Sequence, residues 1–201
     1  MSNEQLINSE TTKWAQEDRK LSGLGITGLA VLLAMIAFLS GCGSKPQQQP
    51  SLADQHALAK ELFENTTKQF HIPSAEAKGA EKLRLQTEAV AGYERLLKEY
   101  PDQDYWAAQA LRSLGNIYAS QTNLDAAVKE YALVEKRYPK QEWELLMAWK
   151  SAADLLWQEN RKEDARQFYT KIVQRFDTPE SAQVIKTVVR GSRHRLENSL
   201  S

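Results

Sequence analysis

Hydrophobic residues follow two different patterns along this chain of 201 residues. From Leu21 to Ser44 the sequence carries no charged residue, and its apolar centre runs from Leu24 to Leu39. Beyond residue 51, apolar residues recur at three- and four-residue intervals between charged ones, which is the period of amphipathic helices. The pattern therefore predicts a membrane-directed N-terminal helix followed by an all-α domain.

The apolar run fits two kinds of membrane-directed segment. A secretory signal peptide has an apolar stretch of roughly 7–15 residues, whereas a transmembrane helix needs roughly 20. Arg19 and Lys20 precede the run and favour a cytoplasmic N-terminus, which would place the following domain outside the cytoplasm. The run ends in Leu39-Ser40-Gly41-Cys42, and Cys42 is the only cysteine of the chain.

These four residues resemble a bacterial lipobox, in which an aliphatic residue and two small residues precede a cysteine. The resemblance implies a signal peptide over residues 1–41, cleavage before Cys42 and lipidation of its sulfur. Because Gly43 and not Asp follows, it also implies an outer-membrane lipoprotein that faces the periplasm. The alternative is an uncleaved single-pass anchor in the inner membrane, with the domain in the periplasm. Residues 42–51 are polar with two prolines and predict a flexible tether.

Three segments further along the chain align with one another in a 38-residue period. In each, a small residue is followed four positions later by tyrosine and three positions after that by an aliphatic residue, so all three lie on one helical face. The tyrosines are Tyr93, Tyr131 and Tyr169. A preceding helix recurs with the same period, with Gly115 and Ala153 allowing close approach of its partner. The periodicity predicts stacked helix pairs.

The first and last elements are less regular than the middle ones. We expect a first helix over Ser51–Phe70, an irregular loop over residues 71–74, and a long second helix from Ser74 to Tyr100. Thr178 and Pro179 predict the start of a last helix by N-cap and first-turn chemistry. Its inner stripe would consist of Val184, Ile185, Val188, Val189 and Leu196.

The order of a large residue, Leu-Gly, Tyr, then Ala, an aromatic, an aliphatic and Pro resembles the tetratricopeptide repeat (TPR). The resemblance spans about residues 52–199 and implies an α-solenoid of about three helix pairs plus a C-terminal capping helix. The 38-residue period is similar to that of a subclass of envelope lipoproteins. That subclass includes the outer-membrane-assembly lipoprotein and the cell-division coordinator of the Tol–Pal system.

Composition and motifs argue against nucleic-acid binding, metal binding and catalysis. The 26 basic and 26 acidic residues give a formal net charge of zero, which does not favour nucleic-acid binding. The three histidines, His56, His71 and His194, lack metal-ligand spacing and are interpreted as solvated residues. No Gly-rich phosphate loop or nucleophile elbow occurs. The sequence predicts no enzyme, no catalytic residue, no metal site and no cofactor.

The TPR resemblance also implies which residues face the groove. These are Arg112, Asn116, Lys150, Asp154 and Trp157. Arg112 and Asn116 resemble part of the clamp by which some TPR proteins hold a peptide carboxylate, although both could be ordinary exposed residues. Trp157 could be a contact hot spot or a buried aromatic between repeats. Trp106 and Trp143 are expected to be packing residues, and the basic residues near the C-terminus a solvated face.

The leading hypothesis is a non-enzymatic, membrane-anchored scaffold that binds partner proteins or peptides in the bacterial envelope. Outer-membrane assembly, envelope organisation and secretion are the processes that the resemblance suggests. Two alternatives stay open: a single-pass inner-membrane protein beside a translocon, and a peptidoglycan-acting enzyme.

Overall fold

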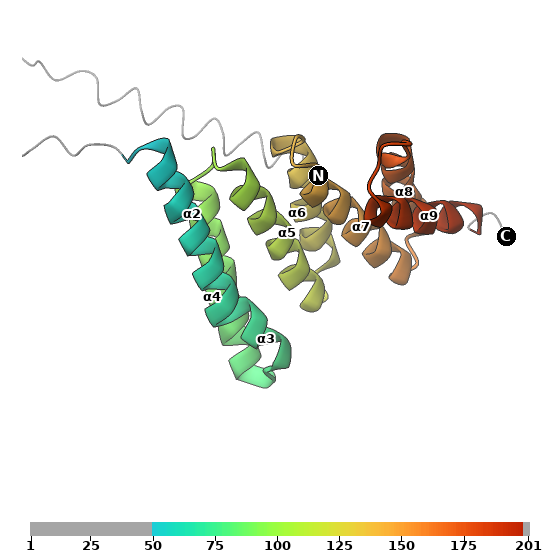
Figure 1. The fold of residues 1–201 in the computed structure, drawn as a ribbon. Helices are drawn as coiled ribbons and strands as arrows, with labels where there is room; N and C mark the ends of the chain where they lie inside the picture. Colours follow the sequence, from blue (N-terminus) through green and yellow to red (C-terminus); the bar gives the residue numbers. More distant parts are fainter. Residues whose placement is uncertain (1–49, 199–201) are drawn as a thin grey trace, which may run out of the picture. The chain divides into compact units, whose positions relative to one another are not determined.

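The computed structural model describes residues 50–198, and within this range the chain is helical, with no β-strand. Figure 1 shows the helices following one another in a single stack, in the order of the sequence. Their bounds are α2 Leu52–Thr66, η1 Thr67–His71, α3 Ile72–Glu76, α4 Gly79–Glu99, α5 Asp104–Ser120, α6 Leu124–Arg137, α7 Glu142–Gln158, α8 Lys162–Phe176 and α9 Gln183–Glu197. The predicted all-α class is therefore confirmed for this part of the chain.

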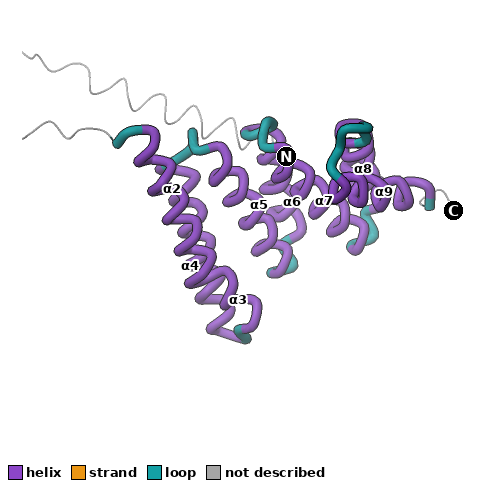
Figure 2. Tube along the Cα trace, viewed as in Figure 1, coloured by secondary structure: helices purple, strands orange, loops and turns teal. Residues whose placement is uncertain are grey.

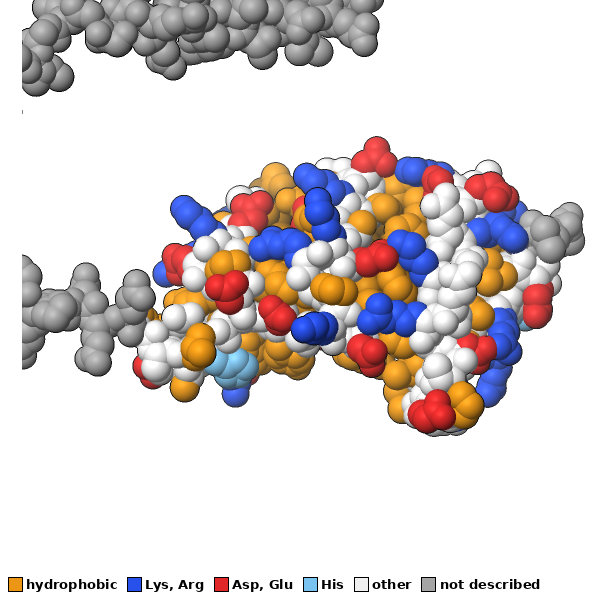
Figure 3. Space-filling view, turned by 90° about the horizontal axis from the view of Figure 1, so that it is seen from above, with side chains coloured by type: hydrophobic (Ala, Val, Ile, Leu, Met, Phe, Trp, Pro, Cys, Tyr) orange, Lys and Arg blue, Asp and Glu red, His pale blue; other side chains and the backbone are white. Residues whose placement is uncertain are grey.

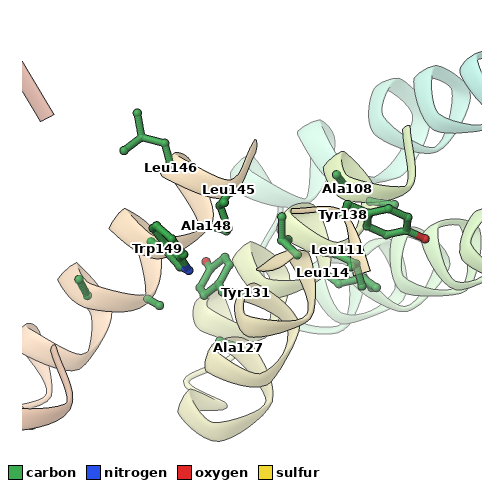
Figure 4. Packing of buried hydrophobic residues seen from close by; sticks show 14 of the residues in the cluster. Ala108, Leu111, Leu114, Ala127, Tyr131, Tyr138, Leu145, Leu146, Ala148 and Trp149 are labelled. Carbon is green, nitrogen blue, oxygen red and sulfur yellow. The ribbon is translucent and has the colours of Figure 1, made fainter. Parts of the chain in front are cut away.

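Each helix packs against its neighbours in the sequence: α2 and α4, α5 and α6, and α7 and α8 form pairs, with α9 against α8. The residues of the predicted stripe form the core, because the three aligned tyrosines are each at most 2% exposed. Ala89, Ala127 and Ala165 are fully buried, as are the aliphatic residues three positions after each tyrosine. Figure 4 shows this packing where α5, α6 and α7 meet.

The turns between helices lie at two opposite edges of the stack (Figure 2). One edge holds the N-terminal residue of the described part, Pro50, and the turns that contain Pro101, Pro139 and Pro179. We call it the proline edge. Tyr100 and Tyr138 end their helices there with the same backbone angles, φ −131° and ψ 50°. The repeat thus extends to the geometry of the turns.

The predicted loop over residues 71–74 is wrong. The helix that begins at Leu52 continues to Glu76 through the π-helical segment η1, in which the Ile72 N–H donates to the Thr67 carbonyl. Proline normally disrupts a helix because it has no N–H and its ring meets the preceding turn. The wider π turn just before Pro73 loosens the backbone hydrogen-bond pattern of the helix at that point, which makes room for the proline. The chain breaks instead at Ala77 and Lys78, before Gly79 starts α4 with φ +54°.

The predicted start of the last helix is also wrong, because α9 begins at Gln183 and not at Thr178. The Ser181 N–H and side chain bond to the Thr178 and Phe176 carbonyls, which holds residues 178–181 in a turn. In consequence Val184 is 53% exposed rather than part of the inner stripe, whereas Val189 is buried.

In the sequence, α9 follows α7 by about one repeat, where a fourth pair would begin. Three positions of α5 that carry Leu111, Leu114 and Tyr118 correspond in α9 to Thr187, Arg190 and His194. These polar residues are exposed. These positions offer no apolar face to a further partner helix, which agrees with the predicted role of α9 as a capping helix.

No helix of the described residues is long and apolar enough to cross a membrane. The apolar run Leu24–Leu39, Cys42 and all but the last two residues of the tether lie outside the described residues.

Candidate functional site

The predicted groove residues lie on α5 and α7, the first helices of the second and third pairs. Asn116 and Asp154 occupy equivalent positions of the repeat, and each accepts a hydrogen bond from a repeat tyrosine of its partner helix. The Tyr131 hydroxyl lies 2.7 Å from Asn116 Oδ1, and the Tyr169 hydroxyl lies 2.7 Å from Asp154 Oδ1. The buried tyrosine thus fixes the polar side chain at the surface of the first helix.

The first pair makes the same connection with different residues. The Tyr93 hydroxyl lies 2.8 Å from Thr67 Oγ1 and 2.9 Å from His71 Nδ1, both on the π-helical segment η1. The π segment therefore stands where α5 and α7 present Asn116 and Asp154. His71 is half-buried here, which corrects its interpretation as a solvated residue.

Burial sets the protonation of these groups. Burial raises the pKa of Tyr131 to about 12, and burial together with the Asp154 carboxylate raises the pKa of Tyr169. Burial, with a smaller contribution from nearby Arg112, lowers the pKa of His71 below its usual value. The tyrosines are therefore neutral hydrogen-bond donors at physiological pH, and His71 is uncharged there.

Arg112 joins the second pair to the third. Its Nε lies 2.6 Å from Oε2 of Glu144 at the start of α7. The Glu144 side chain is 4% exposed and that of Arg112 is 25% exposed. The terminal NH2 groups of Arg112 have no hydrogen-bond partner among residues 50–198, so the guanidinium keeps donors available at the surface. Arg112 is thus both a structural cation and a possible ligand donor.

In the third pair, Lys150 and Asp154 bind each other, with Lys150 Nζ 2.5 Å from Asp154 Oδ2. Trp157 lies one turn further along α7, half-buried, with its ring edge-on to Tyr169 at 6.1 Å. The Arg195 guanidinium of α9 lies 4.9 Å from the centre of the Trp157 ring. The capping helix therefore covers part of the predicted groove at this end of the stack.

Two cavities open beside these residues. One of about 290 Å³ lies between α7, α8 and α9, and Lys150, Asp154 and Arg195 are among its lining residues. The other, of about 90 Å³, lies between α3, α4 and α5 and is lined partly by His71, Lys82 and Asn116. Both have polar and charged side chains suited to hydrogen bonding among their lining residues. Arg112 and Trp157 line neither of them.

The structure thus places the five predicted groove residues on two successive first helices, all partly exposed. Sequence reasoning missed Glu144, Thr67 and His71, which hold this surface together. Glu144 is 32 positions from Arg112, so no local spacing signals the pair. Tyr93 shares the register of Tyr131 and Tyr169, which indicates that its hydroxyl also bonds to the first helix of its pair. The irregular helix of the first pair hid which residues, Thr67 and His71, accept that contact.

The described residues contain no group of three or more His, Cys, Asp or Glu side chains placed to hold a metal ion. Their surface carries both charge signs, and Figure 3 shows Lys and Arg interspersed with Asp and Glu on one face. The predicted absence of enzymatic activity stays a prediction.

In comparison with known proteins, residues 77–102 match the family model of the tetratricopeptide repeat. The matched segment contains α4, the second helix of the first pair. No curated protein and no solved structure matched the chain. The match and the stacked helix pairs together support a tetratricopeptide-repeat protein, a class that mediates contacts between proteins.

Proposed function

From the premise of a tetratricopeptide-repeat array, we propose that this chain is a non-enzymatic scaffold of the bacterial envelope. It binds peptides or partner proteins through the surface formed by η1, α5 and α7. The observation that carries the proposal is the row of polar side chains that the buried tyrosines hold: Thr67 and His71 in the first pair, Asn116 in the second and Asp154 in the third. Stacked repeats present such a row as one extended surface.

The chemistry of this surface favours an extended polypeptide as ligand. Arg112 and the amide of Asn116 offer donors to peptide carbonyls or carboxylates, and Trp157 offers an aromatic contact of the kind that often dominates binding energy. Lys150 and Asp154 present both charge signs, which would set the register of the ligand. Affinity would come from a few such anchors rather than from one deep pocket.

Photo-crosslinking in living cells tests this proposal. A photoreactive residue at Arg112 or Trp157 should capture one or a few envelope proteins, because both positions lie on the proposed surface. Identification of the captured proteins by mass spectrometry would then name the partner. If neither position captures a protein while α9 does, the assignment of the surface is wrong.

We further propose that Cys42 is the lipid attachment point and that the domain is held at the outer membrane, facing the periplasm. Attachment would restrict the domain to the membrane surface and raise the effective concentration of partners there. Assembly of the outer membrane and organisation of the envelope are the processes that we propose first. Secretion beside an inner-membrane translocon would require the uncleaved anchor instead.

The mass of the mature N-terminus separates the two anchors. We expect an N-terminal peptide that begins at Cys42 and carries the added mass of acyl chains. We also expect Cys42→Ala to release the chain from the membrane fraction or to leave it mislocalised. A mature chain that keeps residues 1–41, and that fractionates unchanged after the substitution, would contradict lipid attachment and support the single-pass anchor.

A further inference from the structure

The proline edge carries exposed apolar side chains that the helix packing does not use. Leu52 is 76% exposed, Tyr105 47% and Trp143 45%. Tyr105 and Trp143 occupy equivalent positions of the repeat, so α5 and α7 each present an aromatic residue in the first turn. The exposure of Trp143 corrects its interpretation as a packing residue. The exposed prolines Pro50, Pro101, Pro139 and Pro179 lie on the same edge.

We propose that the proline edge rests on the lipid bilayer, with Tyr105 and Trp143 in the headgroup region. Tyrosine and tryptophan favour this region because their rings are apolar and their O–H and N–H groups remain hydrated. The inference rests on the lipid attachment proposed above and names the surface that this attachment brings to the membrane.

The point where the chain leaves the domain favours this orientation. The N-terminal end of α2 lies at the proline edge (Figure 2), and the described chain begins two residues before it, at Pro50. Pro50 stands eight positions after Cys42. Fully extended, those eight steps span at most about 28 Å. Helices α5 and α7 have 17 residues each, about 25 Å from one edge to the other. To put the opposite edge on the bilayer, nearly all of the tether would have to run alongside the domain.

The edge carries charges of both signs. Asp102, Asp104 and Glu142 are exposed beside Pro101 and Pro139, and so are Lys98, Arg137 and Lys140. Arg175 donates to the Pro139 carbonyl and lies 3.9 Å from Glu142. An edge of mixed charge has no net attraction to anionic headgroups, so the aromatic side chains would enter a zwitterionic surface.

Two tryptophans on one helix provide the test. Trp143 and Trp157 are fourteen positions apart on α7, about 21 Å along its axis. The mature lipidated protein, purified from the membrane fraction, is reconstituted in phosphatidylcholine vesicles with brominated acyl chains, which quench nearby tryptophans. Trp143→Phe should remove at least half of the quenching seen in the wild type, whereas the control Trp157→Phe should leave it unchanged. Far-UV circular dichroism of both variants checks the fold.

The other outcomes separate the two proposals. If the chain floats with the vesicles but Trp143→Phe and Trp157→Phe lose equal quenching, the docking of the proline edge is wrong and the anchor stands. If the wild type floats without being quenched, the conclusion is the same. If the chain does not float with vesicles at all, the anchor fails and the inference fails with it.

Discussion

Substituting Gly115 by alanine should destabilise the helical array by about 2–3 kcal/mol, the upper part of the range for overpacked cores. A β-carbon at this position would lie 2.4 Å from Cε1 and 2.6 Å from Cδ1 of Tyr131. The ring is buried and its hydroxyl is bonded to Asn116, so it cannot turn aside without losing that bond. The cost of this overlap outweighs the roughly 1 kcal/mol that alanine contributes over glycine inside a helix.

Gly191 is the matched control, because it stands two repeats further on in α9 at the equivalent position. Apart from the adjoining residues and the backbone of its own helix, no atom lies within 4 Å of a β-carbon built there. Gly191→Ala should therefore stabilise the chain, by at most about 1 kcal/mol. In thermal unfolding of the full chain, we expect Gly115→Ala to lower the Tm by roughly 5–10 °C and Gly191→Ala to raise it slightly. Equal shifts for both variants would show that α5 and α6 are not in close contact.

Replacing Glu144 by glutamine should cost about 2 kcal/mol, which is less than the roughly 3–5 kcal/mol for breaking a fully buried ion pair. The substitution keeps the shape of the side chain but removes the charge that Arg112 faces at 2.6 Å. The cost is smaller because the Arg112 side chain is 25% exposed and solvent screens part of the interaction. Since the Arg112–Glu144 ion pair joins α5 to α7, the substitution weakens the interface between the second and third helix pairs.

Chemical denaturation of the full chain measures this effect, with Glu99→Gln as control. Glu99 lies 2.9 Å from Arg95 in an exposed pair within one helix, and such pairs add little to stability. We expect the denaturation midpoint of Glu144→Gln to fall clearly below that of Glu99→Gln, which should match the wild type. A midpoint for Glu144→Gln equal to that of the wild type would mean that Arg112 and Glu144 do not support the interface.

The sequence was sufficient for the repeat itself. The common register of Tyr93, Tyr131 and Tyr169 predicted one buried stripe, and all three tyrosines are in the core. Ser51 and Asp54 have the three-residue spacing of a capping box at the start of the expected first helix, and both of its hydrogen bonds form. Such features depend on spacing within one helix or on one fixed period, which is why they can be read without coordinates.

The wrong predictions concern features that depend on contacts between residues beyond one helical turn or on the packing of neighbouring helices. Pro73 predicted a break, but a π turn accommodates it inside a continuous helix. Thr178 and Pro179 have the composition of a helix start, yet Ser181 holds them in a turn. Glu144 resembles a solvated charge of an amphipathic helix, and only its contact with Arg112 explains its burial.

The central claim is that the first helices of the repeats form the partner-binding surface. The most direct measurement compares photo-crosslinking yields of the full chain in cells from three positions: Trp157 on α7, Lys129 on the second helix α6, and Arg190 on the capping helix α9. The account predicts a specific captured protein from Trp157 at a yield at least tenfold above that from Lys129 or Arg190. A captured protein that is strongest from Lys129 or Arg190, with none from Trp157, would contradict it.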